Sequence, residues 1–271
     1  MPETISLVTG ATSGLGKAIA LGLAQHGCQV VIVGRDRGRA EATVGGIKDT
    51  SGNPRIDYLL ADLSSQGSIR QLVEAFKRKY SVLHILVNNA GVYKSSRTVS
   101  PDGLESMFAT NHLAYFLLST LLLEVLKASA PASIFNVTAP STTQLAFDDL
   151  QGEKHFSSLH AFGASKAANL LFTYKLAREL QGTGVVVNAY HPGLVRTSLM
   201  REAAFPINVL ANLFAAPPEK AAKGLVELAV TYAHGQTGKF FKGTTPIDSS
   251  AYTRDEQVQD RLWAESVKLA G

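Results

Sequence analysis

Short runs of apolar, mainly β-branched residues alternate along the chain with longer segments whose apolar residues recur at helical spacing. We expect the short runs to form strands at Thr4–Thr9, Gln29–Val33, Asp57–Leu60, Leu83–Asn88, Ser133–Val137 and Val185–Ala189. The segments between them predict helices over residues 15–26, 37–48, 65–80, 102–127 and 160–181. The strands contain continuous apolar runs rather than alternating apolar and polar residues, which is typical of parallel strands buried on both faces. The pattern therefore predicts an α/β fold: a doubly wound Rossmann fold whose parallel sheet carries helices on both faces.

The chain shows no repeat, linker-like stretch or charged tail, so we expect its 271 residues to form a single domain, 1–271. Residues 197–218 interrupt the alternation of predicted strands and helices, because they are apolar, contain three prolines and have no strand signal. In an open α/β sheet a late insertion of this kind commonly covers the ligand crevice. We therefore expect 197–218 to form a substrate lid, with an ordinary pair of surface helices as the alternative.

Composition excludes several classes of function. Hydrophobic residues make up 45% and charged residues 18% of the chain, and the net charge of +4 is spread without clusters. This composition gives no support to a nucleic-acid partner. Cys28 is the only cysteine, and no histidine or acidic spacing predicts a metal site. The first strand begins too early for a signal peptide, and the apolar stretch at 113–126 is too short to span a bilayer. We expect a cytoplasmic protein.

Glycines are concentrated directly after the first predicted strand, in the segment TGATSGLGK at residues 9–17. Glycine is needed where a backbone turns sharply, approaches a pyrophosphate and packs a helix on a strand. The start of the following helix offers unpaired N–H groups and the positive end of its dipole to phosphates. The position of this segment between a strand and a helix predicts a dinucleotide-binding turn.

The spacing Gly-x-x-x-Gly-x-Gly resembles the signature of the short-chain dehydrogenase/reductase family. Further matches follow in order: ADL at 61–63, NNAG at 88–91, TNHLA at 110–114, SK at 165–166 and HPG at 191–193. The segments QGEK at 151–154, SKAAN at 165–169 and RLW at 261–263 resemble the retinol dehydrogenase branch. The resemblance covers nearly the whole chain and implies the strand order 3-2-1-4-5-6-7.

The resemblance also implies roles for individual residues. Asp62 should hydrogen-bond the adenine ring, Asn89 should stabilise the sheet beside the cofactor, Lys166 should hold the nicotinamide ribose, and Thr197 should meet the carboxamide. The complete set of residues expected to contact a nicotinamide cofactor is Gly10, Ser13, Gly14, Leu15, Gly16, Arg35, Asp62, Leu63, Asn89, Ala90, Gly91, Lys166, Pro192, Gly193 and Thr197.

The end of the second predicted strand indicates which cofactor is bound. An acidic residue there would accept the ribose hydroxyls and repel a 2′-phosphate. Aligned on the family, Gly34 occupies that position and Arg35 follows it. Because a guanidinium group can bind phosphate through two hydrogen bonds, NADP(H) is favoured. In the alternative, Asp36 turns inward and selects NAD.

The family's reaction uses Asn, Ser, Tyr and Lys, and this chain keeps only two of them. Asn111 and Lys166 match, but the Tyr-x-x-Ser-Lys frame begins with Phe162 and the serine position holds Ala139. Losing a general acid costs about 10²–10⁴ in rate, and losing an oxyanion donor about 10²–10³. Thr138 and His160 are expected to face away from the site, and Ser141 lies two positions beyond Ala139. Four further residues have suitable chemistry, but packing roles are expected for them: Tyr93, Tyr115, His155 and Tyr190.

Several functions stay open on these residues. The chain could be an NADP(H)-dependent oxidoreductase that reduces an iminium or a conjugated alkene, which needs no proton delivery to a carbonyl oxygen. It could instead be a non-redox isomerase or cyclase, a silent cofactor binder, or a reductase deliberately inactivated by Ser→Ala and Tyr→Phe changes. Phe162 and the apolar residues of 205–214 predict a small apolar substrate. The helices at 102–127 and 160–181 resemble those of the family's four-helix dimer interface, which leaves a homodimer or homotetramer open.

Overall fold

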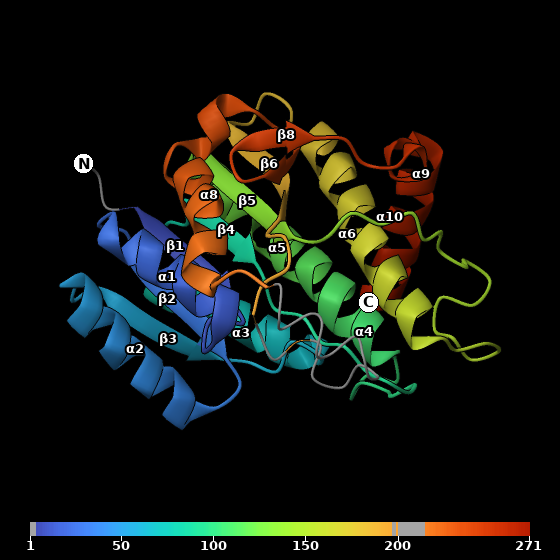
Figure 1. Cartoon of the computed structure of the whole chain (residues 1–271), viewed down its shortest axis with the longest axis horizontal. Coiled ribbons are helices and arrows are strands. Elements are labelled where there is room, and N and C mark those ends of the chain that lie inside the picture. The colour runs from blue at the N-terminus through green and yellow to red at the C-terminus, as the bar shows by residue number, and fades with distance from the viewer. Residues whose placement is uncertain (1–3, 197–198, 200–214) are drawn as a thin grey trace.

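The computed structural model describes residues 4–196, 199 and 215–271. These residues form one eight-stranded sheet of order β3-β2-β1-β4-β5-β6-β7-β8 (Figure 1). The strands are β1 Ile5–Thr9, β2 Gln29–Gly34, β3 Ile56–Leu60, β4 Ile85–Asn88, β5 Ala132–Val137, β6 Val185–His191, β7 Phe240–Lys242 and β8 Thr245–Ile247. All pairs up to β7 are parallel, which confirms the expected order. The expectation of a wholly parallel sheet is corrected by β8, which returns antiparallel along β7 as a three-residue edge strand.

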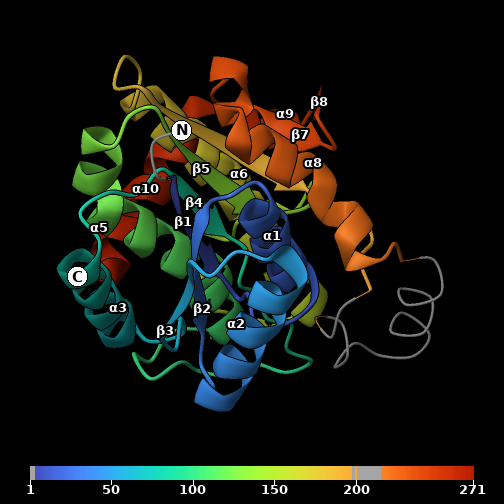
Figure 2. The ribbon, with the colours of Figure 1, turned by 90° about the vertical axis from the view of Figure 1, so that its left-hand side faces the viewer.

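Helices cover both faces of the sheet. They are α1 Gly14–Gln25, α2 Arg37–Ser51, α3 Gln66–Lys79, α4 Ser106–Phe108, the π-helix η1 Ala109–Leu113, α5 Ala114–Ala128, α6 Ser158–Glu179, α8 Pro218–Val230, the 3₁₀ turn η2 Tyr232–Gly235, α9 Ala251–Arg254 and α10 Glu256–Ala270. Helices α1, α2 and α8 lie on one face, and α3, α5, α6 and α10 on the other (Figure 2). The helix predicted over 102–127 begins four residues later, because the Glu105 carboxylate caps the N–H groups of Met107 and Phe108.

Successive side chains of the central strands enter opposite cores. Leu7 packs with the helices behind the sheet, whereas Val8 packs with α1 and α8, and both are fully buried. This alternation on a doubly covered sheet explains why the strands contain continuous apolar runs.

Within the described residues, one helix is long and apolar enough to cross a membrane: the continuous segment Ser106–Ala128. In the structure 72% of its most apolar window is buried inside the protein. Its apolar side chains are therefore packed against the sheet and the neighbouring helices.

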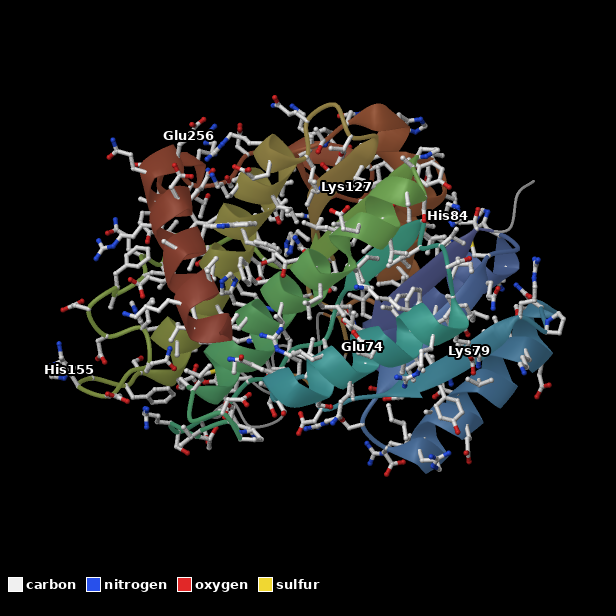
Figure 3. All side chains as sticks on the ribbon, turned by 180° about the vertical axis from the view of Figure 1, so that it is seen from behind. Glu74, Lys79, His84, Lys127, His155 and Glu256 are labelled. Carbon is white, nitrogen blue, oxygen red and sulfur yellow. The ribbon has the colours of Figure 1, made fainter. Side chains whose placement is uncertain are left out.

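The C-terminal helix α10 packs along α6 and α5 (Figure 3). The Trp263 ring lies 5.0 Å from the ring of Phe116 in α5 and 6.1 Å from that of Phe172 in α6. Arg178 of α6 also bonds Asp260 at 3.1 Å. The two helices that resemble the family's dimer-forming pair are thus contacted by a helix of the same chain.

The predicted lid at 197–218 lies outside the described residues, except for Leu199 and 215–218. Val195 and Ala216, near its two ends, form an isolated parallel bridge. Pro217 and Pro218 belong to the start of α8, where Pro218 occupies the first helical turn. A proline is tolerated there because its missing N–H group would have no helical acceptor.

Candidate functional site

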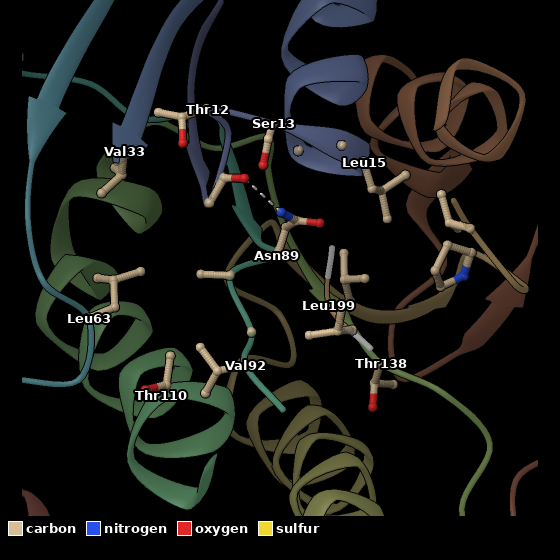
Figure 4. A pocket seen from close by; sticks show the side chains of 18 of the residues that line it. Thr12, Ser13, Leu15, Val33, Leu63, Asn89, Val92, Thr110, Thr138 and Leu199 are labelled. Carbon is tan, nitrogen blue, oxygen red and sulfur yellow. Dashed lines mark hydrogen bonds between the residues drawn. The ribbon is translucent and has the colours of Figure 1, made fainter. Parts of the chain in front are cut away.

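A pocket of about 580 Å³ opens at the carboxyl ends of the parallel strands, beside the point where the chain order reverses between β1 and β4 (Figure 4). Such a switch point is where open α/β sheets bind ligands. All expected cofactor residues line it except Thr197, which lies outside the described residues: Gly10, Ser13, Gly14, Leu15, Gly16, Arg35, Asp62, Leu63, Asn89, Ala90, Gly91, Lys166, Pro192 and Gly193. Of the four expected catalytic positions, Ala139, Phe162 and Lys166 line it.

The glycine turn brings the start of α1 against this pocket. Gly10 has a φ of +63°, and a Cβ there would lie 2.8 Å from the Ala90 Cα. A Cβ on Gly16 would lie 2.5 Å from the Gly10 carbonyl oxygen, so neither position admits a side chain. Ser13 is the N-cap of α1 and makes no side-chain capping bond within the described part of the chain. The first N–H groups of the helix and its positive dipole end are therefore directed at the pocket.

Asn89 and Thr9 hold β1 and β4 together at the base of the pocket. The Asn89 Nδ2 donates to the Thr9 carbonyl oxygen at 2.9 Å. The Thr9 Oγ1 accepts the backbone N–H groups of Asn89 and Ala90 at 2.9 and 3.1 Å. This arrangement agrees with the sheet-stabilising position expected for Asn89.

Two arginines form the pocket wall at the end of β2. Arg35 was expected there, and Arg39 of α2 joins it. Asp36 does not line the pocket as far as the chain is described, because its Oδ1 accepts the Arg39 N–H at 2.8 Å and caps α2. An acidic side chain at position 34 would have to displace Thr12, since a Cβ would lie 2.4 Å from the Thr12 methyl carbon. The site therefore offers positive charge where a 2′-phosphate would lie.

The other end of the pocket carries Phe162, Ala139 and Lys166. The Lys166 Nζ lies 5.1 Å from the centre of the Phe162 ring, and the Tyr93 ring packs edge-on against Phe162 at 5.5 Å. Lys166 is only 7% exposed, and burial lowers its pKa to about 8. This end thus contains a buried amine beside two side chains that have no hydroxyl group.

Asn111 lies behind the pocket and is not among the described residues that line it. Its Oδ1 accepts the Val92 N–H at 2.7 Å, and its Nδ2 donates to the Val92 carbonyl and to the Ser165 Oγ. Its own carbonyl oxygen accepts the Asn169 Nδ2 at 2.8 Å. Asn111 is therefore held by protein partners on every polar group of its side chain.

Thr138 differs from the expectation. It lines the pocket beside Ala139, because β5 ends at Val137 and strand alternation no longer applies. Its Oγ1 donates to the Lys166 carbonyl at 2.9 Å. The Ser141 hydroxyl, by comparison, donates to the carbonyl of Gly163 at 2.8 Å, outside the pocket lining.

The other candidate acids are not among the described residues that line the pocket. The Tyr93 hydroxyl donates to Ser158, that of Tyr115 to the Ala90 carbonyl, and that of Tyr190 to the Ala221 carbonyl. The remaining two are exposed side chains: His155 and His160. Sequence reasoning missed further lining residues, chiefly Thr12, Val33, Arg39, Ala61, Thr110, Val137, His191, Leu194, Val195 and Leu199. Ala61, Thr110 and His191 stand in motifs that matched the family, and Leu199 in the predicted lid, while the signal for Arg39 was a basic residue in the first turn of α2.

Comparison with known proteins identifies the class. Residues 4–205 match the family model for short chain dehydrogenases, and the chain belongs to this family. Human retinol dehydrogenase 12 is 39% identical over 277 residues, covering 100% of this chain and 87% of that protein. Human retinol dehydrogenase 13 is 38% identical, covering 100% and 86%. The resemblance to the retinol dehydrogenase branch is thereby confirmed.

Solved structures agree. A Pseudomonas aeruginosa RhlG/NADP active-site complex superposes with a TM-score of 0.72 and 29% identity, covering 91% of this chain and 95% of that one. A short-chain dehydrogenase from Sphingobium yanoikuyae in complex with NADPH gives a TM-score of 0.69 and 26% identity, covering 86% of each chain. The Rossmann-type fold is therefore that of the family.

Proposed function

We propose that this chain is an NADP(H)-dependent oxidoreductase with an atypical active site, acting on a small apolar molecule. One observation carries the proposal: a pocket lined by the described residues that are expected to bind the nucleotide lacks hydroxyl groups at the two positions, 139 and 162, where the family's serine and tyrosine are expected. The family membership makes the chain an oxidoreductase by class, and the altered end of the pocket restricts what it can reduce.

The residues of the pocket suit NADP(H). The start of α1 would take the pyrophosphate, Asp62 the adenine ring, and Arg35 and Arg39 the 2′-phosphate. Lys166 would hold the nicotinamide ribose. The NADP and NADPH complexes of the similar structures support this assignment. When bound, the reduced cofactor supplies a hydride.

An apolar wall suits an apolar substrate. Beside the pocket, a cluster joins two buried side chains to partly buried ones: Tyr93, Met107, Val92, Phe156, Ala161, Phe162 and Leu199. The named substrate of the similar retinol dehydrogenases is also largely apolar. Such a lining binds by excluding water and offers few polar contacts.

Without a hydroxyl acid, this end favours an electrophile that accepts hydride readily. An iminium carbon is reduced by hydride alone. A conjugated enal or enone takes the hydride at its β carbon and gives an enolate, whose charge is shared between oxygen and carbon and whose proton is added to carbon. A simple ketone, by contrast, gives an alkoxide whose whole charge lies on an oxygen that Phe162 and Ala139 cannot stabilise. Lys166 would supply positive charge near the reacting atoms.

The proposal is tested by following NADPH absorbance with cyclic iminium salts, conjugated enals and enones, and simple apolar ketones and aldehydes, with NADPH binding measured in parallel. Consumption with the first two classes and little with simple ketones is expected. NADPH binding without consumption on any substrate would favour the silent or non-redox alternative, which the missing hydroxyls also support. Absence of NADPH binding would refute the proposed function outright.

A further inference from the structure

The C-terminal helix α10 contacts the turn that carries Asn111. Ser266 of α10 is fully buried, and its Oγ lies 2.9 Å from the Nε2 of His112, the residue after Asn111. The His112 ring is buried against the rings of Phe108 and Phe172, at 5.1 and 6.1 Å. Burial lowers the pKa of His112 to about 4, so the ring is neutral at physiological pH.

Asn169 of α6 bonds the same turn. Its Nδ2 donates to the Asn111 carbonyl at 2.8 Å, within the π-helix η1. The Ser266 hydroxyl donates to the Leu262 carbonyl at 2.7 Å, so the Nε2–H of the neutral His112 ring donates to the Ser266 Oγ. Among the described residues, the His112 Nδ1 and the Asn169 Oδ1 are buried without a hydrogen-bond partner.

Asn111 in turn holds one wall of the pocket. Its side-chain amide makes both hydrogen bonds to the backbone of Val92, at 2.7 and 3.0 Å. Gly91 and Val92 line the pocket. A Cβ on Gly91 would lie 3.4 Å from the Asn111 Oδ1 and 3.8 Å from the Lys166 Nζ, which places this wall at the Lys166 end.

We propose that His112 and Ser266 are positioning residues for the reacting end of the pocket. The pair joins α10, through Asn111, which directly precedes His112 in η1, to the wall that Gly91 and Val92 form. Neither side chain touches substrate or cofactor, so each acts only by holding its neighbour. The proposal rests on the NADP(H) binding proposed above and gives the last helix of the chain a part in it.

Two ligands test the two ends of the pocket separately. NADPH would occupy both ends, whereas adenosine 2′,5′-bisphosphate carries only the part expected at Arg35 and Arg39. For Ser266→Ala and for His112→Phe we expect NADPH affinity to fall about 2- to 30-fold, the range found for residues that modulate coupling without ligand contact. Affinity for the bisphosphate should not change. Because the two residues act through one bond, the double variant should lose little more than either single one.

The matched control is Lys175→Met. Lys175 bonds Asp260 of α10 at 2.9 Å, apart from the His112–Ser266 pair, so this change loosens α10 by another route. This variant should not weaken NADPH binding more than it weakens binding of the bisphosphate. Ser266→Ala removes one oxygen atom and decides the question if His112→Phe does not fold. Unchanged NADPH affinity in folded Ser266→Ala, or equal weakening of the binding of both ligands, overturns the proposal. Failure of the parent protein to bind NADPH refutes the proposed function instead, and this inference with it.

Discussion

Removing either Arg35 or Arg39 should weaken NADPH binding and leave NADH binding nearly unchanged. Both side chains line the pocket at the end of β2, beside Gly34. Asp36, the nearest carboxylate in sequence, is engaged as the cap of α2. The expected contact is therefore with the one group that distinguishes the cofactors, the 2′-phosphate.

The size of the effect follows from the exposure of these arginines. A hydrogen bond to a charged group contributes about 1.5–3 kcal/mol, which corresponds to roughly 10- to 150-fold in affinity. Arg35 and Arg39 are both exposed, so solvent screening places each loss at the lower end, about tenfold. Since both would contact one phosphate, the double variant should lose less than the product of the two.

Calorimetric or fluorescence titration with NADPH and NADH measures the ratio directly. Arg37→Ala is the matched control, because Arg37 pairs with Glu41 at 3.7 Å and with the Tyr58 hydroxyl at 3.0 Å, away from the pocket lining as described. It should leave the ratio unchanged. Equal affinities of the parent for the two cofactors, or an Arg37 effect as large as that of Arg35, would refute the reasoning.

The same wall predicts how the preference could be reversed. A Cβ at Gly34 would collide with the Thr12 methyl carbon at 2.4 Å, so Gly34→Asp alone should be strained. Combined with Thr12→Ala, it should favour NADH, because the new carboxylate accepts ribose hydroxyls and repels phosphate. Three further outcomes are expected. Ala139→Ser with Phe162→Tyr should raise the rate of NADPH-dependent ketone reduction by about 10²–10⁴-fold, mostly through Phe162→Tyr. No gain in a folded double variant that binds NADPH would contradict the interpretation that this chain is a reductase lacking only these two hydroxyl groups. The free energy of unfolding should fall by about 3 kcal/mol between pH 6.5 and pH 4, because His112 is protonated at a higher pH in the unfolded chain than in the folded protein, where burial lowers its pKa to about 4. In urea titrations, His112→Gln should lack this part of the fall. Trp263→Ala should lower the free energy of unfolding by about 2 kcal/mol, because it uncovers the rings of α5 and α6. The uncovered face should also shift the protein toward self-association on gel filtration, and an unchanged elution volume would argue against that face as a contact surface.

The strands and the phosphate-binding turn were predictable because local sequence decides them. The strands β1 to β6 fall within two residues of their predicted bounds, since a buried parallel strand must be apolar along its length. The glycine spacing predicted close backbone contacts, which Gly10 and Gly16 make. The motif frame also predicted that Ala139 and Phe162 stand where the resemblance implies serine and tyrosine, and both residues line the pocket.

What the sequence alone determined, then, is the order of elements, the nucleotide-binding turn and the identity of the side chains at the reacting end, because each depends on neighbours in the chain. Only the tertiary structure decided which groups meet across elements. It placed Arg39 beside Arg35, turned Asp36 into a helix cap, and drew Asn111 behind the pocket wall. It also packed α10 on α5 and α6, where Trp263 covers the rings of Phe116 and Phe172. Burial of these rings is favourable, but the local sequence does not show which helix buries them.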